Sequence, residues 1–231
     1  MAVRATQPLH APCCDTAGAP VVVLSFPAAA VAGPDRIREV ARLLVDTHRS
    51  GNRVVGVLSA SEMTMAELVA LATRVAERPE PREYDMLFSA GATIVVALCA
   101  MAVHDLGVEA ISLSGSQAGI VTDTAHGAAT IVHVRAERVR EALARGLIVL
   151  VADAQGVSAE REVTTFGPAG ANVTAPALAA ALDASWEVVL DGPSAEGVPA
   201  SLPQPSFERF QSSYESKLDL SAVAVSPRFP L

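Results

Sequence analysis

The sequence predicts an α/β fold, a three-layer αβα sandwich in which helices cover both faces of a mainly parallel β-sheet. Of its 231 residues, 51% are hydrophobic and only 4% are aromatic, a composition typical of buried parallel strands. Short apolar runs alternate along the chain with longer segments of helical periodicity. These observations predict one domain over residues 20–231, preceded by a tail over residues 1–19.

The first half of the chain shows this alternation most clearly. We expect a buried strand over 20–26 and a helix over 34–50, in which apolar residues recur every three or four positions. The pair Gly51-Asn52 ends that helix, and 53–59 is the next strand. A helix over 64–77 follows, and then one long helix over 83–106 with a break near Gly91.

The second half continues the pattern in shorter pieces. The expected strands lie at 109–114, 147–152 and 186–190, and helices at 136–145 and 175–182. Short extended pieces are expected at 120–122 and 129–132, a small hairpin arm at 162–165, a loop over 191–205, and a last helix followed by a strand at 222–225. In such sheets ligands bind outside the carboxyl ends of the strands, here 24–30, 58–62, 113–119, 151–156 and 190–193.

Composition excludes several classes of partner. The net charge of −8 and the lack of a basic block argue against nucleic acid and against an anionic membrane. The longest apolar runs, 93–103 and 147–152, are shorter than the roughly 18–20 residues of a bilayer span. We expect no signal peptide, since residues 1–18 lack an apolar core. Three cysteines, of which Cys13 and Cys14 are adjacent, predict a reduced, cytoplasmic protein without a disulfide framework.

Three stretches carry a family resemblance: DRIREVARLLVDTHRSGNRVVGVLSA (35–60), EYDMLFSAGATIVVALCAMAVHDLGVEAISLSGSQAGIVTDTAHGAATI (83–131) and GLIVLVADAQGVSAEREVTTFG (146–167). They resemble the catalytic domain of aspartate kinases, in the amino acid kinase family. The similarity covers about 21–229 and implies an amino acid kinase-like fold and a homodimer. It stops where the family's C-terminal regulatory domains would begin, so we expect a chain that lacks them.

The resemblance also shows where the sequence departs from the family. After the first strand the family has a lysine, an aromatic residue, two glycines and two hydroxyl residues, which hold phosphate. Here the same place reads Ser25-Phe26-Pro27-Ala28-Ala29-Ala30. The lysine is missing, Pro27 has no N–H to donate, and alanine replaces glycine where close approach is needed.

Four other family motifs are altered in the same way. The family's Ser-Ala-Met-Gly is replaced at 59–62 by Ser-Ala-Ser-Glu, and its Ser-Thr-Gly-Glu at 89–92 by Ser-Ala-Gly-Ala. The family's Gly-Arg-Gly-Gly-Ser-Asp-Thr-Thr corresponds to residues 167–174, where the arginine is missing. In the nucleotide loop, 190–201, only Asp191 clearly survives. Because phosphoryl transfer depends on charge neutralisation and positioning, these changes predict degenerate ATP and aspartate sites and a pseudokinase.

The replacing residues suggest a different ligand. They are apolar where the family is polar or has glycine: Phe26, Pro27, Ala28, Ala29, Ala30, Met63, Met65, Ala90, Ala92, Val173 and Leu190. Such a cleft would favour an apolar or amphiphilic small molecule. Glu62 and Asp153 are carboxylates where the family usually has glycine, and they could serve as general acid or base. Alternatively, they face solvent or, as with Glu62, lie at a helix start.

The main hypothesis is therefore an ATP-independent enzyme that isomerises, eliminates or cyclises an apolar metabolite in specialised metabolism. Its predicted catalytic residues are Glu62 and Asp153, with no metal and no cofactor. The predicted substrate-binding residues are Ser25, Phe26, Ser59, Met63, Ala90, Ser114, Asp123 and Asp191. Two alternatives stay open: a non-catalytic protein that binds a ligand or pairs with an active kinase, and residual aspartate kinase activity. For His126 we expect a structural role.

Overall fold

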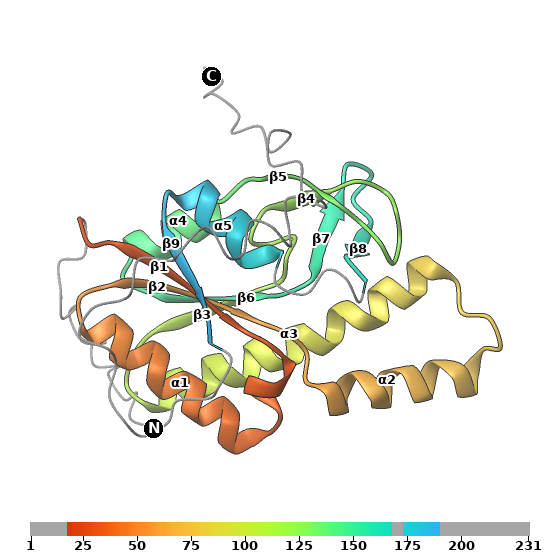
Figure 1. The fold of residues 1–231 in the computed structure, drawn as a ribbon, viewed down its shortest axis with the longest axis horizontal. Coiled ribbons are helices and arrows are strands. Elements are labelled where there is room, and N and C mark those ends of the chain that lie inside the picture. The colour runs from red at the N-terminus through yellow and green to blue at the C-terminus, as the bar shows by residue number, and fades with distance from the viewer. Residues whose placement is uncertain (1–17, 168–172, 190–231) are drawn as a thin grey trace, which may run out of the picture.

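The computed structural model describes residues 18–167 and 173–189, which contain a central sheet of five parallel strands (Figure 1). Its strand order is β3-β6-β2-β1-β9. The strands are β1 (Val21–Phe26), β2 (Arg53–Leu58), β3 (Ala110–Leu113), β6 (Ile148–Ala152) and β9 (Ser185–Val188). The predicted α/β class is therefore confirmed.

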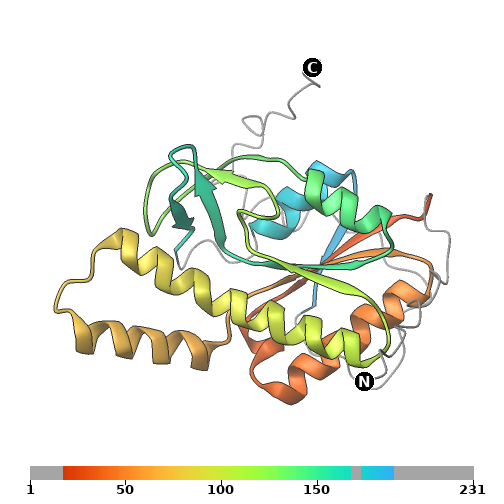
Figure 2. The same cartoon turned by 180° about the vertical axis from the view of Figure 1, so that it is seen from behind.

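Helices cover both faces of this sheet, and each face has its own core (Figures 1 and 2). Alternate strand residues point to opposite faces: Val22 and Leu24 belong to one core, whereas Val23 belongs to the other. The first core contains the short 3₁₀ helix η1 (Ala28–Val31), α1 (Pro34–Arg49) and α3 (Pro81–Asp105). The second contains α4 (Glu137–Ala144) and α5 (Thr174–Leu182).

A second, smaller sheet stands beside the main one. Its order is β5-β4-β7-β8, formed by β4 (Ile120–Thr122), β5 (Ile131–Val134), β7 (Gln155–Ser158) and β8 (Val163–Thr165). The expected short extended pieces and the hairpin arm are thus confirmed as strands, but the sequence did not show that they form one sheet. β8 packs against α3, so the small sheet contacts the same long helix that lies against β3 and β6 of the main sheet.

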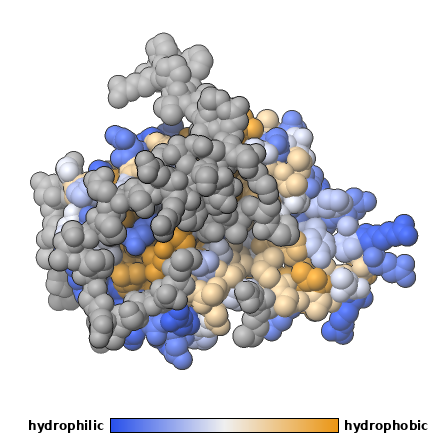
Figure 3. All heavy atoms as spheres, viewed as in Figure 1, coloured by the Kyte–Doolittle hydropathy of each residue, from blue (hydrophilic) through white to orange (hydrophobic). Residues whose placement is uncertain are grey.

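The predicted break near Gly91 is wrong, because α3 runs continuously from Pro81 to Asp105. A Cβ at Gly91 would lie 3.0 Å from Met65 Sδ and 3.2 Å from Ala60 Cβ. The glycine therefore serves a close approach to α2 (Glu62–Val75) rather than a bend. Helices α2 and α3 form an arm that projects from the domain (Figure 1), with apolar side chains along it and hydrophilic ones at its tip (Figure 3).

Helix α3 is long and apolar enough to cross a membrane by length and composition alone. Its position in the structure gives a different explanation. It lies against α1, β3, β6 and β8, and the residues it buries in the fold are Asp85, Gly91, Ala92, Val95, Val96, Cys99, Ala100 and Val103. We therefore describe α3 as a core helix of the domain.

Candidate functional site

Ser59 and Asp153 meet where the neighbouring strands β2 and β6 end. Leu58 and Ala152 are the last paired residues of these strands, and Ser59 and Asp153 follow them directly. The Ser59 hydroxyl donates to Asp153 Oδ2 over 2.7 Å, and the Asp153 N–H donates to the Leu58 carbonyl over 3.0 Å. Asp153 is only 3% exposed. A hydroxyl and a buried carboxylate are thus fixed at the carboxyl ends of parallel strands, where ligands bind in α/β proteins.

The second oxygen of Asp153 connects this edge to α5. The Ala154 N–H lies 2.7 Å from Asp153 Oδ1 and 3.1 Å from the hydroxyl oxygen of Thr174, the first residue of α5. Ala154 has a φ of 58°, in the left-handed region, where an L-residue other than glycine costs about 1–2 kcal/mol. The unfavourable backbone conformation of Ala154 thus lies at the candidate site, and such conformations are often found at functional sites.

Gln155 fixes the next part of the site. Its side chain is 3% exposed; the amide nitrogen donates to the Ser89 carbonyl on α3 over 2.9 Å, and the amide oxygen accepts from the Gly115 N–H over 3.3 Å. A Cβ at Gly115 would come within 1.9 Å of the Gln155 carbonyl oxygen, so only glycine allows the loop to pass there. Ser114 follows β3 in the same loop, and its hydroxyl lies 3.0 Å from that of Ser116.

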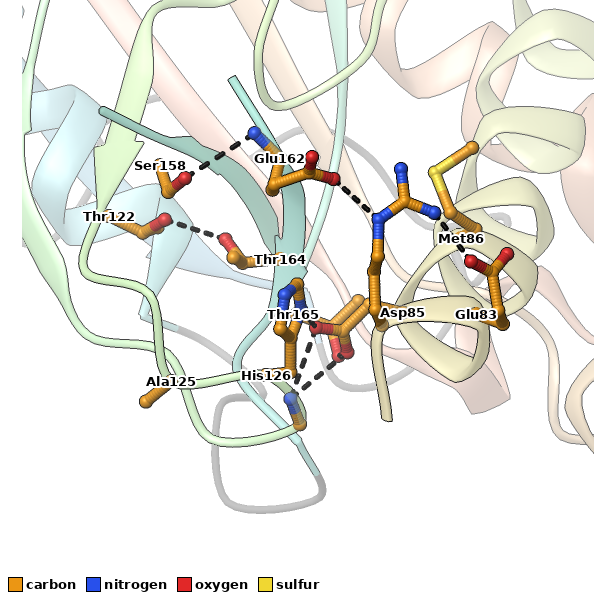
Figure 4. Close-up of polar contacts among 12 residues, drawn as sticks. Glu83, Asp85, Met86, Thr122, Ala125, His126, Ser158, Glu162, Thr164 and Thr165 are labelled. Atoms are coloured by element: carbon orange, nitrogen blue, oxygen red, sulfur yellow. Dashed lines mark hydrogen bonds and ion pairs between the residues drawn. The ribbon is translucent and has the colours of Figure 1, made fainter. Parts of the chain in front are cut away.

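A separate polar cluster holds the β4–β5 loop on α3 (Figure 4). At its centre is Asp85, a fully buried carboxylate. His126 Nδ1 lies 2.7 Å from Asp85 Oδ2, the Gly127 N–H lies 3.1 Å from both carboxylate oxygens, and the Thr165 hydroxyl donates to Oδ1. The structure thus gives His126 a structural contact, in agreement with the role expected for it.

Two groups in the described residues have shifted pKa values. Burial raises the pKa of the Cys99 thiol from 9.0 to about 12. The pKa of Arg82 is raised by its hydrogen bond to Glu83 and, next, by its hydrogen bond to Glu162. Neither group lies at the strand ends that carry Ser59 and Asp153.

Of the predicted site residues, Ser25 lies on the same face of the sheet as Ser59 and Asp153, one row deeper. It is 1% exposed, and its hydroxyl has no hydrogen-bond partner within the described part of the chain. Phe26 lies on the opposite face, completely buried in the core with α1 and α3. It therefore helps to form that core.

The other predicted residues lie elsewhere. Ala90 is exposed on α3, and Asp123 accepts the N–H groups of Ala125 and Thr130 within its own loop. Glu62 and Met63 are the first two residues of α2, which agrees with the alternative that Glu62 lies at a helix start. Asp191, the 191–205 loop, the 222–225 strand and the Cys13-Cys14 pair lie outside the described residues.

Sequence reasoning missed three buried polar residues: Asp85, Gln155 and Thr174. The signal available for Asp85 was a carboxylate near the start of a long and mostly apolar helix. No local pattern marked Gln155 or Thr174, since their partners are distant in sequence. Within residues 18–167 and 173–189, no three His, Cys, Asp or Glu side chains are grouped to hold a metal ion.

A hollow of about 650 Å³ lies elsewhere, over the small sheet and the β7–β8 turn. Its lining includes valines, hydroxyl residues and charged residues, among them Asp123, Arg135 and Glu160. Neither Ser59 nor Asp153 lines it. We place the candidate site at the strand ends because buried polar groups converge there, whereas this hollow is an open surface.

Comparison with known proteins gives consistent matches. Residues 20–196 match the model of the amino acid kinase family. An aspartokinase of Corynebacterium glutamicum is 45% identical over 208 residues, and one of Mycolicibacterium smegmatis is 49% identical over 165. These alignments cover 88% and 71% of this chain but 49% and 39% of the relatives, so the chain spans less than half of their length.

Solved structures agree with these matches. The aspartate kinase from Synechocystis matches with a TM-score of 0.63 and 34% identity, over 75% of this chain and 28% of that one. Aspartokinase III of E. coli, in complex with aspartate and ADP, has a TM-score of 0.64 at 22% identity over 73% of this chain and 48% of that one, and so supports the fold.

These comparisons overturn the main functional hypothesis. The expectation of an ATP-independent isomerase, lyase or cyclase is wrong, since curated relatives with 42–49% identity are named aspartokinase. Substitutions at the strand ends do not by themselves indicate another reaction. The similarity over most of the chain outweighs them.

Proposed function

Because the chain belongs to the amino acid kinase family, we propose that it is an aspartate kinase of low turnover, which transfers the γ-phosphoryl group of ATP to a carboxylate of aspartate. The observation that carries this proposal is the 45% identity to an aspartokinase over 88% of the chain. A cytoplasmic, reduced setting belongs to the same proposal, and the free, buried thiol of Cys99 is compatible with it.

The reaction needs little covalent chemistry from the protein. A carboxylate oxygen of aspartate attacks the γ-phosphorus, the bond from that phosphorus to the bridging oxygen breaks, and ADP leaves with the electron pair. Since the nucleophile is already ionised, the protein has to position the two substrates and neutralise phosphate charge. The hydroxyls of Ser59 and Ser114, at the carboxyl ends of β2 and β3, are candidate orienting groups.

Low turnover follows from the residues at the end of β1. Ser25 stands where the resemblance implies a lysine, and a neutral, buried hydroxyl cannot replace a positive charge beside phosphate. Losing one such electrostatic contact typically costs about 10²–10³ in rate. We therefore expect a turnover number at least about 10²-fold below that of a typical aspartokinase.

The test is an assay for aspartate-dependent ADP release by the purified chain, with the acyl phosphate trapped by hydroxylamine. The Corynebacterium glutamicum aspartokinase serves as the parallel standard. We expect slow formation of aspartyl hydroxamate that requires both substrates and decreases further in Ser59→Ala. Complete absence of hydroxamate over long incubation, with the standard active, would refute the proposal.

The second candidate is a non-catalytic member of the family, which binds aspartate or nucleotide without transfer or pairs with an active kinase. The neutral residue at position 25 favours it, because binding tolerates the loss of a charge better than transfer does. Calorimetry of the chain with aspartate and with MgATP separates the two candidates when read beside the hydroxamate assay. Binding without any product supports the second candidate.

A further inference from the structure

Asp153 is a buried carboxylate that has no cationic partner among residues 18–167 and 173–189. It is 3% exposed, and both groups that donate to it, the Ser59 hydroxyl and the Ala154 N–H, are neutral. None of the ion pairs within the described residues includes it. Buried charges in proteins are normally paired with an opposite charge, so this one calls for an explanation.

The place of Asp153 gives that explanation. It follows the last residue of β6, next to the end of β2, where two central strands of the sheet end side by side. It also shares the Ala154 N–H with Thr174 Oγ1, which places it beside the start of α5. The first turn of α5 contains no acidic residue, and its N-cap, Val173, has no side-chain hydrogen bond.

The start of a helix attracts negative charge, and strand ends of this kind receive ligands. An acidic group of a ligand at this place would meet a negative charge that the protein already holds there. In a poorly solvated site, two like charges about 5 Å apart repel one another strongly enough to change affinity tenfold or more. A cationic or neutral group would meet no such obstacle.

We propose that Asp153 determines the charge selectivity of this site: it acts as a resident anion that weakens the binding of acidic ligand groups. This inference rests on the proposed function, because the acidic groups concerned are the carboxylates of aspartate and the phosphates of ATP. Weaker binding of both substrates would raise their KM values, an effect separate from the low turnover proposed above. Among the residues at these strand ends, Asp153 is thus a specificity-determining residue that opposes the reaction.

Calorimetry on the full chain tests the inference with three ligands: aspartate, its uncharged-side-chain analogue asparagine, and MgATP. The main variant is Asp153→Asn, which removes the charge and keeps the shape. Its amide oxygen can still accept the Ala154 N–H, and Ser59 can accept from its NH₂ group. We expect the affinity for aspartate to increase at least about tenfold, and that for asparagine to change much less.

Asp105→Asn is the matched control, since it removes the same net charge from an exposed position at the end of α3. We expect its affinities to equal those of the wild type. Asp153→Gly, the residue that the resemblance implies, is the second variant and is used if Asp153→Asn does not fold. Unchanged aspartate affinity in the folded variant, or an equal gain in the control, would overturn the inference.

The outcomes also separate this inference from the proposed function. A gain in aspartate affinity without hydroxamate in any variant supports the role of Asp153 and contradicts the kinase proposal. Hydroxamate formation in the wild type, with aspartate affinity unchanged in Asp153→Asn, supports the kinase proposal and contradicts the role of Asp153.

Discussion

Single buried polar side chains hold the segments around the candidate site in place. Asp85 holds the β4–β5 loop and β8 on α3, whereas Gln155 holds the Gly115 loop on the same helix. Both are almost completely removed from solvent. Because an unsatisfied buried polar group is costly, each of these networks should be sensitive to loss of a single acceptor.

Replacement of Asp85 tests the first network. In Asp85→Asn, an NH₂ group takes the place of one acceptor oxygen and faces N–H or O–H donors. We expect the free energy of unfolding to decrease by about 3 kcal/mol, the usual size for a buried charged acceptor. Equilibrium unfolding in urea measures this change.

Asp35→Asn is the control for that measurement. Asp35 lies in the first turn of α1, and its side chain is 92% exposed. Its ion pair with Arg38 is of the exposed kind, worth about 0–1 kcal/mol. A loss in Asp85→Asn no larger than that of the control would contradict the importance given to the cluster.

The reactivity of Cys99 tests whether α3 is buried at this position. Its thiol is 0% exposed, and burial raises its pKa from 9.0 to about 12. In Cys13→Ser/Cys14→Ser, which leaves Cys99 as the single thiol, we expect a disulfide reagent at pH 8 to react with the folded chain at least about 10³-fold more slowly than with the unfolded chain. Absorbance of the released thiolate gives both rates, and similar rates would show that α3 is less buried than described.

The same shift predicts a pH dependence. The raised pKa means that the thiol of the unfolded chain ionises first as the pH increases. The contribution of Cys99 to stability is therefore complete below pH 9 and is lost between pH 9 and about pH 12.

The secondary-structure elements were predicted well where one local pattern decides them. The main-sheet strands β1, β2 and β6 are mostly apolar runs, and α1 has clear helical periodicity, so these elements were expected within a few residues. The small sheet was missed because its strands, of three or four residues, pair across loops and carry no long pattern. The break predicted at Gly91 is wrong because this glycine allows a tertiary contact, with Met65 of α2, which no local pattern shows.

The β7–β8 hairpin has a turn that its sequence does not suit well. Arg161 has a φ of 68° and is exposed. Its side chain therefore buries little surface that could offset the cost of the left-handed backbone conformation. Arg161→Gly should increase the free energy of unfolding by about 1 kcal/mol. Urea unfolding is again the measurement.

Ala159→Gly is the matched control in the same turn. Ala159 is exposed and is not among the described non-glycine residues with positive φ. Glycine there should lower stability by roughly 0.5–1 kcal/mol, because it adds freedom to the unfolded chain. If both variants change stability in the same direction, the backbone explanation fails.

The whole molecule shows where sequence reasoning reached its limit for the candidate site. Ser59 and Asp153 could be proposed together because they follow strands whose carboxyl ends meet at one edge. That the two side chains bond to each other, and that Ala154 links them to α5, depends on distances that no local pattern encodes. The predicted reaction was wrong for a different reason, because the absence of family residues does not by itself indicate new chemistry.

The outer face of α3 carries the last prediction, which concerns assembly. Ile94, Leu98 and Met101 are 47%, 46% and 64% exposed, and they are spaced so that they lie along one side of the helix. No charged residue is exposed on α3 between Glu83 and His104. Such an apolar stripe is typical of a contact surface.

A second copy of this chain, related by a two-fold axis, would satisfy the stripe. With two α3 helices antiparallel and centred between Ile94 and Leu98, Ile94 of one copy faces Leu98 of the other. The small side chain of Ala90 then lies near the large side chain of Met101, offset by about 1.5 Å along the helix axis. This self-complementarity is what an isologous interface requires. We therefore expect a homodimer in solution.

Analytical ultracentrifugation tests this expectation with Leu98→Asp, which places one charge in each half of the interface. We expect the wild type to sediment as a dimer and Leu98→Asp as a monomer with an unchanged circular dichroism spectrum. Leu71→Asp is the control, because Leu71 is 52% exposed and lies on α2, outside the stripe on α3; this variant should stay dimeric. A monomeric wild type, or a dimer that survives Leu98→Asp, would contradict the predicted interface.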